Sequence, residues 1–127
     1  MSKVPTLYID AAPFIDLVKV KVGKGIPDQG QKDARTLDRI LRAARDDALQ
    51  ALTSTLSIAE CTHINDRRKS ETAKPFFMGL LASGKGGVRL VQTTFSIAER
   101  ARDLRWLYNV KLKGADAVHV ASAIHME

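Results

Sequence analysis

A short apolar segment near the start of the chain constrains the fold more than any other feature. Leu7, Tyr8 and Ile9 run directly into the carboxylate of Asp10, and a helix-like stretch with Pro13 near its start follows at once. A short continuous apolar run is typical of a strand buried on both faces, as in a parallel sheet. An acid at the carboxyl end of such a strand lies where open α/β sheets bind ligands. We therefore expect a parallel sheet with a ligand site beside Asp10.

The rest of the chain alternates between strand-like and helix-like stretches. Strands are predicted over residues 6–10, 49–55 and 88–92, and helices over 11–22, 31–47, 57–68, 70–82, 95–110 and from Asp116 onward. This alternation predicts an α/β fold in which helices cover both faces of a small parallel sheet. Since the 127 residues contain no repeat or linker, we expect one domain over residues 1–127. Pro75 is expected in the first turn of its helix.

Charge and cysteine content narrow the class of protein. The chain carries 20 basic and 14 acidic residues, a net charge of +6, which favours a nucleic acid or another polyanion as partner. Basic groups such as Arg67-Arg68-Lys69 also suit solvated helix faces. No apolar run is long enough to span a membrane, and the start of the chain lacks a signal-peptide pattern. A lone cysteine, Cys61, cannot form an internal disulfide, so we expect a cytoplasmic protein.

Three acids, Asp10, Glu60 and Asp116, each begin a predicted helix, and each has a simple structural interpretation. Asp10 could cap a helix N-terminus. Ser57 and Glu60 have the spacing of a capping box, in which the serine bonds the backbone three residues on and the glutamate reaches back. Asp116 in a first helical turn complements the helix dipole. Helix capping alone could therefore account for all three residues.

The three acids together also suit a metal site. Asp10 and Glu60 each follow the carboxyl end of a predicted strand within one turn, so a parallel sheet can bring them to one edge, and Asp116 can be brought there too. Carboxylates a few ångströms apart repel unless a cation lies between them. Mg²⁺ or Mn²⁺ are the hard divalent ions that prefer such oxygen ligands. A site of this kind can activate water against a phosphodiester.

Three blocks of this sequence resemble a PIN domain, and in particular the VapC-like toxins of bacterial toxin–antitoxin pairs. The blocks are Tyr8-Ile9-Asp10, the segment 53–60 that ends in Glu60, and the segment 114–123 that contains Asp116 followed by an alanine-rich, histidine-containing helix. The order and spacing of the blocks match over nearly the whole chain. The resemblance implies a three-layer α/β/α fold and a Mg²⁺- or Mn²⁺-dependent endoribonuclease, with Asp10, Glu60 and Asp116 as its metal-binding catalytic acids. It also implies a homodimer and a cognate antitoxin that blocks the acidic cleft.

The chain departs from this family at two places. Ala12 stands where the family usually has a small hydroxyl residue. The family commonly has a fourth acid after a further strand beside the first one, and this chain ends before it, at Glu127. We therefore expect the natural protein to continue past Glu127. A three-stranded sheet would also leave one edge of the first strand unpaired, which favours self-association or an antitoxin.

The sequence thus supports a leading hypothesis and an alternative. In the first, the protein is a toxin ribonuclease in which Arg67 and Arg68 steer RNA towards the acids. In the second, it is an inactive PIN-like module that binds RNA or a protein partner, because the fourth acid is missing. Some further residues receive structural interpretations. His63 and His119 are expected in the core or behind the acids. Cys61 is expected to serve packing. Trp106 and Tyr108 are expected to belong to the core and not to form a base-stacking platform.

Overall fold

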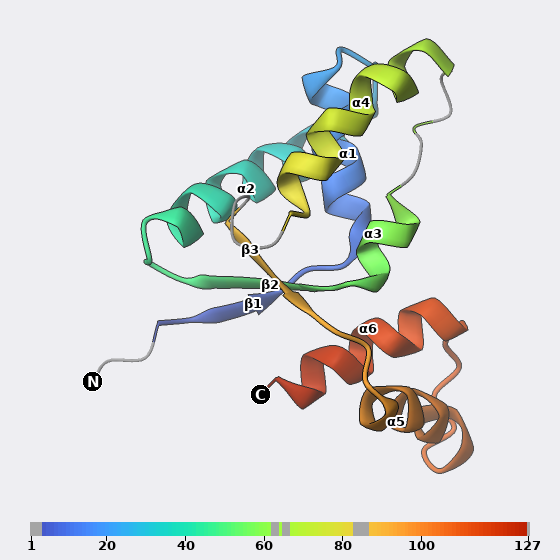
Figure 1. The fold of residues 1–127 in the computed structure, drawn as a ribbon. Coiled ribbons are helices and arrows are strands. Elements are labelled where there is room, and N and C mark those ends of the chain that lie inside the picture. Colours follow the sequence, from blue (N-terminus) through green and yellow to red (C-terminus); the bar gives the residue numbers. More distant parts are fainter. Residues whose placement is uncertain (1–3, 62–63, 65–66, 83–86, 127) are drawn as a thin grey trace.

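A computed structural model describes residues 4–61, 64, 67–82 and 87–126 (Figure 1). The strands are β1 (Thr6–Tyr8), β2 (Gln50–Ser54) and β3 (Val88–Val91). The helices are α1 (Ala11–Lys21), α2 (Asp28–Arg45), α3 (Leu56–Glu60), α4 (Arg67–Leu80), α5 (Phe95–Trp106) and α6 (Gly114–His125). The three predicted strands and the alternation of strands with helices are confirmed. The prediction that the first strand is buried on both faces is wrong, because β1 forms the edge of the sheet; it ends at Tyr8, and its residues are exposed or half-buried.

The strands form one parallel sheet in the order β1-β2-β3. Tyr8 pairs with Leu52, and Leu52 pairs with Arg89, so the carboxyl ends of the three strands lie at the same end of the sheet. β1 is an edge strand, and no strand among the described residues covers its outer side. Leu7, in the middle of this strand, is 41% exposed. The predicted open edge of the first strand is therefore present within the described part of the chain.

Helices cover both faces of the sheet, which gives a three-layer α/β/α arrangement (Figure 1). On one face, α1, α2 and α4 enclose a hydrophobic cluster that includes the fully buried Phe14, Leu37 and Leu41. On the other face, α5 and α6 pack over a second, smaller cluster that includes Leu52 and Ile97. The short helix α3 follows β2 at the carboxyl end of the sheet (Figure 1). The fold class predicted from the sequence is confirmed.

The segment between β2 and β3 differs most from the prediction. The helix expected over residues 57–68 ends at Glu60, and Arg67 and Arg68 belong instead to the start of α4. Pro75 lies inside α4 and not in its first turn. A proline inside a helix removes one backbone hydrogen bond. Ala73 and Phe77, on either side of it, are buried in the core, and their burial offsets that loss.

The prediction that Trp106 and Tyr108 belong to the core is wrong, because they are 75% and 70% exposed. The buried residues of α5 are Ile97 and Ala101, four positions apart on one side of the helix. Trp106 lies five residues beyond Ala101, which at about 100° per residue places it on a different side. α5 ends at Trp106, so Tyr108 no longer follows the helical stripe.

No helix within the described ranges is long and apolar enough to cross a membrane.

Gly87, which precedes β3, offers a test of the contact between the sheet and α2. Its φ is +86°, and a Cβ atom there would lie 2.8 Å from the carbonyl oxygen of Leu41. A side chain at this position would be both strained and in contact with backbone. We expect Gly87→Ala to lower the free energy of unfolding by about 1–3 kcal/mol in urea denaturation.

Gly79 is the matched control for this substitution. It lies inside α4, and a Cβ atom there would meet nothing within 4 Å. Alanine favours the helix by about 0.5–1 kcal/mol over glycine, so Gly79→Ala should stabilise the protein slightly. If both substitutions changed the free energy of unfolding equally, Gly87 would not lie in close contact with the Leu41 carbonyl of α2.

Candidate active site

Asp10 follows β1 and occupies the N-cap position of α1. Its backbone is extended, with φ −81° and ψ −174°, but its side chain accepts no capping hydrogen bond. The residue is exposed at the carboxyl end of the sheet. Asp10 therefore occupies the predicted N-cap position, but its side chain does not make the predicted capping hydrogen bond. Its carboxylate lies at the end of the helix without the bond that capping would require.

Buried hydroxyl groups fix the backbone immediately before Asp10. The N–H of Ile9 donates to the carbonyl of Leu52 at 2.8 Å, and Thr53 Oγ1 donates to the carbonyl of Ile9 at 2.5 Å. Ser57 Oγ lies 2.7 Å from Thr53 Oγ1. Since the hydroxyl proton of Thr53 points to Ile9, Ser57 is the donor in this second contact. Thr53 and Ser57 are fully buried, so the end of β1 is held firmly against β2 and α3.

Glu60 is the last residue of α3, and its carboxylate points to α6. Its Oε1 atom lies 2.6 Å from Nε2 of His119, and its side chain is 32% exposed. The capping box predicted for Ser57 and Glu60 is wrong. Ser57 lies inside α3, where its hydroxyl bonds Thr53, and Glu60 lies at the wrong end of this short helix to reach back. The carboxylate of Glu60 therefore makes a tertiary contact.

His119, on α6, is buried and hydrogen-bonded at both ring nitrogens. Its Nδ1 atom lies 2.9 Å from the hydroxyl of Tyr8, and its Nε2 atom faces Glu60. An ionised carboxylate only accepts, so Nε2 carries the proton; in the neutral ring Nδ1 then accepts from Tyr8. Burial raises the pKa of Tyr8, and the negative charge of Asp10 adds to the rise, while hydrogen bonds to Ser122 and Ser54 oppose it. Tyr8 thus remains a hydrogen donor at neutral pH.

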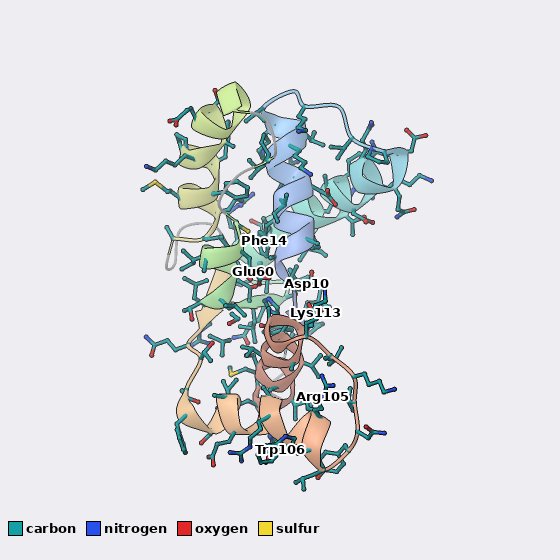
Figure 2. The ribbon with its side chains drawn as sticks, turned by 90° about the vertical axis from the view of Figure 1, so that its right-hand side faces the viewer. Asp10, Phe14, Glu60, Arg105, Trp106 and Lys113 are labelled. Carbon is teal, nitrogen blue, oxygen red and sulfur yellow. The ribbon has the colours of Figure 1, made fainter. Side chains whose placement is uncertain are left out.

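Asp10 and Glu60 lie at the same end of the sheet, on neighbouring elements (Figure 2). Cys61 Sγ, next to Glu60, lies 4.0 Å from the carbonyl oxygen of Ala11, next to Asp10. Asp10 and His119 also line one groove along the open edge of β1. The other residues that line this groove are Leu7, Tyr8, Ile9, Pro13, Ile40, Val120 and Ala123. Asp10 and Glu60 thus lie at one end of the sheet, and their joint role in a metal site stays a prediction.

Asp116 lies in the first turn of α6, as predicted, and is exposed. It precedes His119 by three residues, which is nearly one helical turn. The helix that delivers His119 to Glu60 therefore also carries Asp116 towards this end of the sheet. Figure 2 shows Lys113, which caps the start of the same helix, close to Asp10 in that view.

The donor groups suit a hard divalent cation, since Asp10, Glu60 and Asp116 supply only carboxylate oxygens. Among the residues that the structure describes, no three His, Cys, Asp or Glu side chains are grouped closely enough to hold a metal ion. Mg²⁺ does not require such a cage, because proteins often bind it through one or two carboxylates while water and phosphate complete its ligands. The chemistry of the residues fits the ion, and its placement on all three acids stays a prediction.

Several other predicted residues can be compared with the structure. Cys61 is buried, and burial together with the charge of Glu60 raises the pKa of its thiol to about 12, which agrees with a packing role. His63 lies outside the described residues, and the side chains of Arg67 and Arg68 are not described. Tyr8 and Thr53, which support the site through His119 and the backbone of Ile9, were not predicted from the sequence. The polar residues Thr53 and Ser54 at the end of a buried strand were the signal for this hydroxyl cluster.

Comparison with known proteins gives one match. The PIN domain family matches residues 24–127, a region that contains Glu60, Asp116 and His119 and begins after Asp10. Comparisons with curated proteins and with solved structures find no match. The matched region covers more than half of the chain, and its strands and helices alternate as described above. This chain therefore belongs to the PIN domain family.

Proposed function

We propose that this protein is a metal-dependent endoribonuclease that hydrolyses RNA phosphodiester bonds at the carboxyl end of its sheet. PIN domains are generally nucleases. The observation that carries the proposal is the bond between Glu60 and His119, which holds a carboxylate at the end of the sheet where Asp10 follows β1. The side chain of Glu60 remains 32% exposed in this bond, so its carboxylate stays accessible to solvent at this end of the sheet.

In this proposal Asp10, Glu60 and Asp116 hold Mg²⁺ or Mn²⁺. When bound, such an ion makes water a nucleophile at neutral pH and stabilises negative charge on the phosphodiester. The residues of the chain position the ligands. His119 and Tyr8 fix the direction of the Glu60 carboxylate, and Thr53 fixes the backbone that carries Asp10. Water adds to phosphorus, and the bond from phosphorus to the leaving sugar oxygen breaks.

The biological role that we propose is that of a toxin from a toxin–antitoxin pair, active in the cytoplasm as a homodimer. The resemblance to VapC-like toxins supports this role, and the net charge of +6 is compatible with an RNA substrate. The open edge of β1 offers backbone groups to which a second chain could add a strand. Arg67 and Arg68, at the start of α4, are proposed to guide RNA.

The first test is cleavage of a mixed-sequence RNA by the full chain with Mn²⁺, with Mg²⁺ and with EDTA. We expect cleavage with either ion and none in EDTA. Asp10→Asn, Glu60→Gln and Asp116→Asn should each lower kcat/KM by about 100-fold or more, because each removes a charge that the ion requires, a loss of several kcal/mol. Gel analysis of RNA fragments measures the effect.

Asp28→Asn is the matched control for these acids. Asp28 lies in the first turn of α2, as Asp116 does in α6, and is exposed. Its removal should leave cleavage unchanged. If wild-type protein binds RNA but cleaves none with either ion, the alternative of an inactive RNA-binding module replaces the nuclease proposal. If it neither binds nor cleaves RNA, a protein partner becomes the better hypothesis.

The second test concerns the support of Glu60. Isothermal titration of Mn²⁺ without RNA should show about 10–100-fold weaker binding for His119→Ala, because residues that orient ligands contribute that much to metal affinity. Gln at position 119 can place an N–H near the position of Nε2, so His119→Gln should recover part of the loss. Tyr8→Phe should also weaken binding, because the ring of His119 loses its second hydrogen bond.

Tyr108→Phe is the control for the loss of a tyrosine hydroxyl, since Tyr108 is 70% exposed and lies beyond α5. It should leave Mn²⁺ binding unchanged. Thermal unfolding of every variant separates a loss of fold from a loss of binding. Equal Mn²⁺ affinity of the wild type and of folded His119→Ala would show that His119 only fills space.

A further inference from the structure

A group of large apolar side chains stands in solvent where α5 ends. Trp106, Leu107 and Tyr108 are 75%, 70% and 70% exposed and follow one another in the sequence. Single exposed apolar residues are ordinary, but a contiguous group that includes two aromatic rings indicates an interaction surface. We call the surface formed by residues 102–113 the aromatic platform.

Basic residues are frequent in the segment that carries these rings, although Tyr108 also shares a groove with Glu99 and Asp103. Residues 99–113 contain five basic residues and two acidic ones, Glu99 and Asp103. Arg102 lies 3.9 Å from Glu99 and 3.1 Å from Asp103, so this single arginine compensates both acids. Arg105, Lys111 and Lys113 form no ion pair with any residue in the described ranges. All three are exposed, and in the view of Figure 2 Arg105 and Lys113 lie between Trp106 and Asp10, where a polyanion could meet their charges.

Local contacts order the backbone of the aromatic platform and support the ring of Trp106. The guanidinium of Arg102 lies 5.2 Å from the centre of the Trp106 ring. Asn109 adopts a φ of +54°, a conformation that asparagine tolerates, and this turns the chain after Tyr108. Two backbone bonds close the turn, from Asn109 N–H to the carbonyl of Arg105 and from Val110 N–H to that of Leu104. Binding would therefore cost little ordering of the protein.

We propose that the aromatic platform binds single-stranded RNA by stacking unpaired bases on Trp106 and Tyr108, with phosphates beside Arg105, Lys111 and Lys113. The choice of RNA rests on the proposed function. Aromatic rings interleaved with unpaired cations are the combination that binds single strands without reading sequence. A protein partner would have to place a carboxylate opposite each of these cations to avoid burying an unpaired charge, whereas the phosphates of a single strand supply the negative charges by themselves.

The position of the platform fits this role. In the view of Figure 2, Lys113 lies between Asp10 and Arg105, and Trp106 lies further from the acids. A single strand that stacks on Trp106 can continue past Arg105 and Lys113 towards the acidic edge. The platform would thus hold RNA on one side of the cleavage site without contributing to the chemistry. The basic residues of the platform would also offset the repulsion between RNA phosphates and the acids of the proposed site.

The experiment uses the only tryptophan of the chain as its probe. A 12-nucleotide oligouridylate, which has little structure of its own, is added to the full chain in EDTA, so that binding is measured without cleavage. We expect the fluorescence of Trp106 to be quenched as the oligonucleotide binds. A 12-base-pair RNA duplex should quench it much less, because its bases are already stacked.

Substitutions are measured by the anisotropy of fluorescein-labelled oligouridylate. Trp106→Ala should weaken binding about five-fold or more, the loss expected for one stacked base, and Trp106→Phe should keep most of the affinity. Phe95→Ala is the matched control, since Phe95 is 79% exposed at the other end of α5 and should have no effect. Arg105→Gln and Lys113→Gln should each reduce the slope of log Kd against log salt by about 0.7. Arg35→Gln, an exposed residue on α2, should not.

Two outcomes would overturn the proposal. In the first, oligouridylate binds by anisotropy but leaves Trp106 fluorescence and the affinity of Trp106→Ala unchanged, so that RNA lies elsewhere. In the second, Trp106 emission depends on protein concentration without RNA, and Trp106→Ala turns a dimer into a monomer with unchanged RNA affinity, so that a second copy covers the surface. The binding assay contains no metal and is independent of the cleavage assay. If RNA binds through Trp106 but is not cleaved when Mg²⁺ or Mn²⁺ is supplied, only the nuclease proposal is contradicted.

Discussion

The two hydrogen bonds of His119 join parts of the chain that are far apart in sequence. Tyr8 belongs to β1, Glu60 ends α3, and His119 itself lies on α6. These bonds connect the layer formed by α5 and α6 to the carboxyl end of the sheet. Because the ring is buried, each nitrogen needs its partner, and the loss of either partner would leave an unsatisfied polar group. The position of Asp116, nearly one turn earlier on α6, depends on the same contact.

Local patterns were sufficient to predict the sheet and the places of two acids. The apolar run before Asp10 indicated a strand with a carboxylate at its end, and β1 does precede Asp10, although it stops at Tyr8 and is not buried on both faces. Asp116 lies in a first helical turn, as expected. Both features follow from a few neighbouring residues, so no knowledge of distant contacts was needed. The layers followed from the alternation of strands and helices, because each amphipathic element must bury one face.

Features that depend on tertiary contacts could not be predicted in the same way. The spacing of Ser57 and Glu60 fits a capping box, and only the proximity of His119, 59 residues away, shows what the glutamate does. The burial of Ala73 and Phe77 keeps Pro75 inside a helix against its local preference. Trp106 was predicted to belong to the core, although its position on α5 turns it away from Ala101 and leaves it exposed.

The division of the core into two clusters has a consequence for how the molecule opens. The cluster beneath α5 and α6 is the smaller one and is formed partly by alanines, so it buries less apolar surface than the cluster beneath α1, α2 and α4. Units with less buried apolar surface open at lower free energy than the whole protein unfolds. Backbone amides of α5 and α6 should then exchange with solvent as one cooperative unit, ahead of those in α1 and α2. Each such opening would break the bond between His119 and Glu60 and carry Asp116 away from the sheet, so the fraction of molecules with these residues in place is set by an equilibrium.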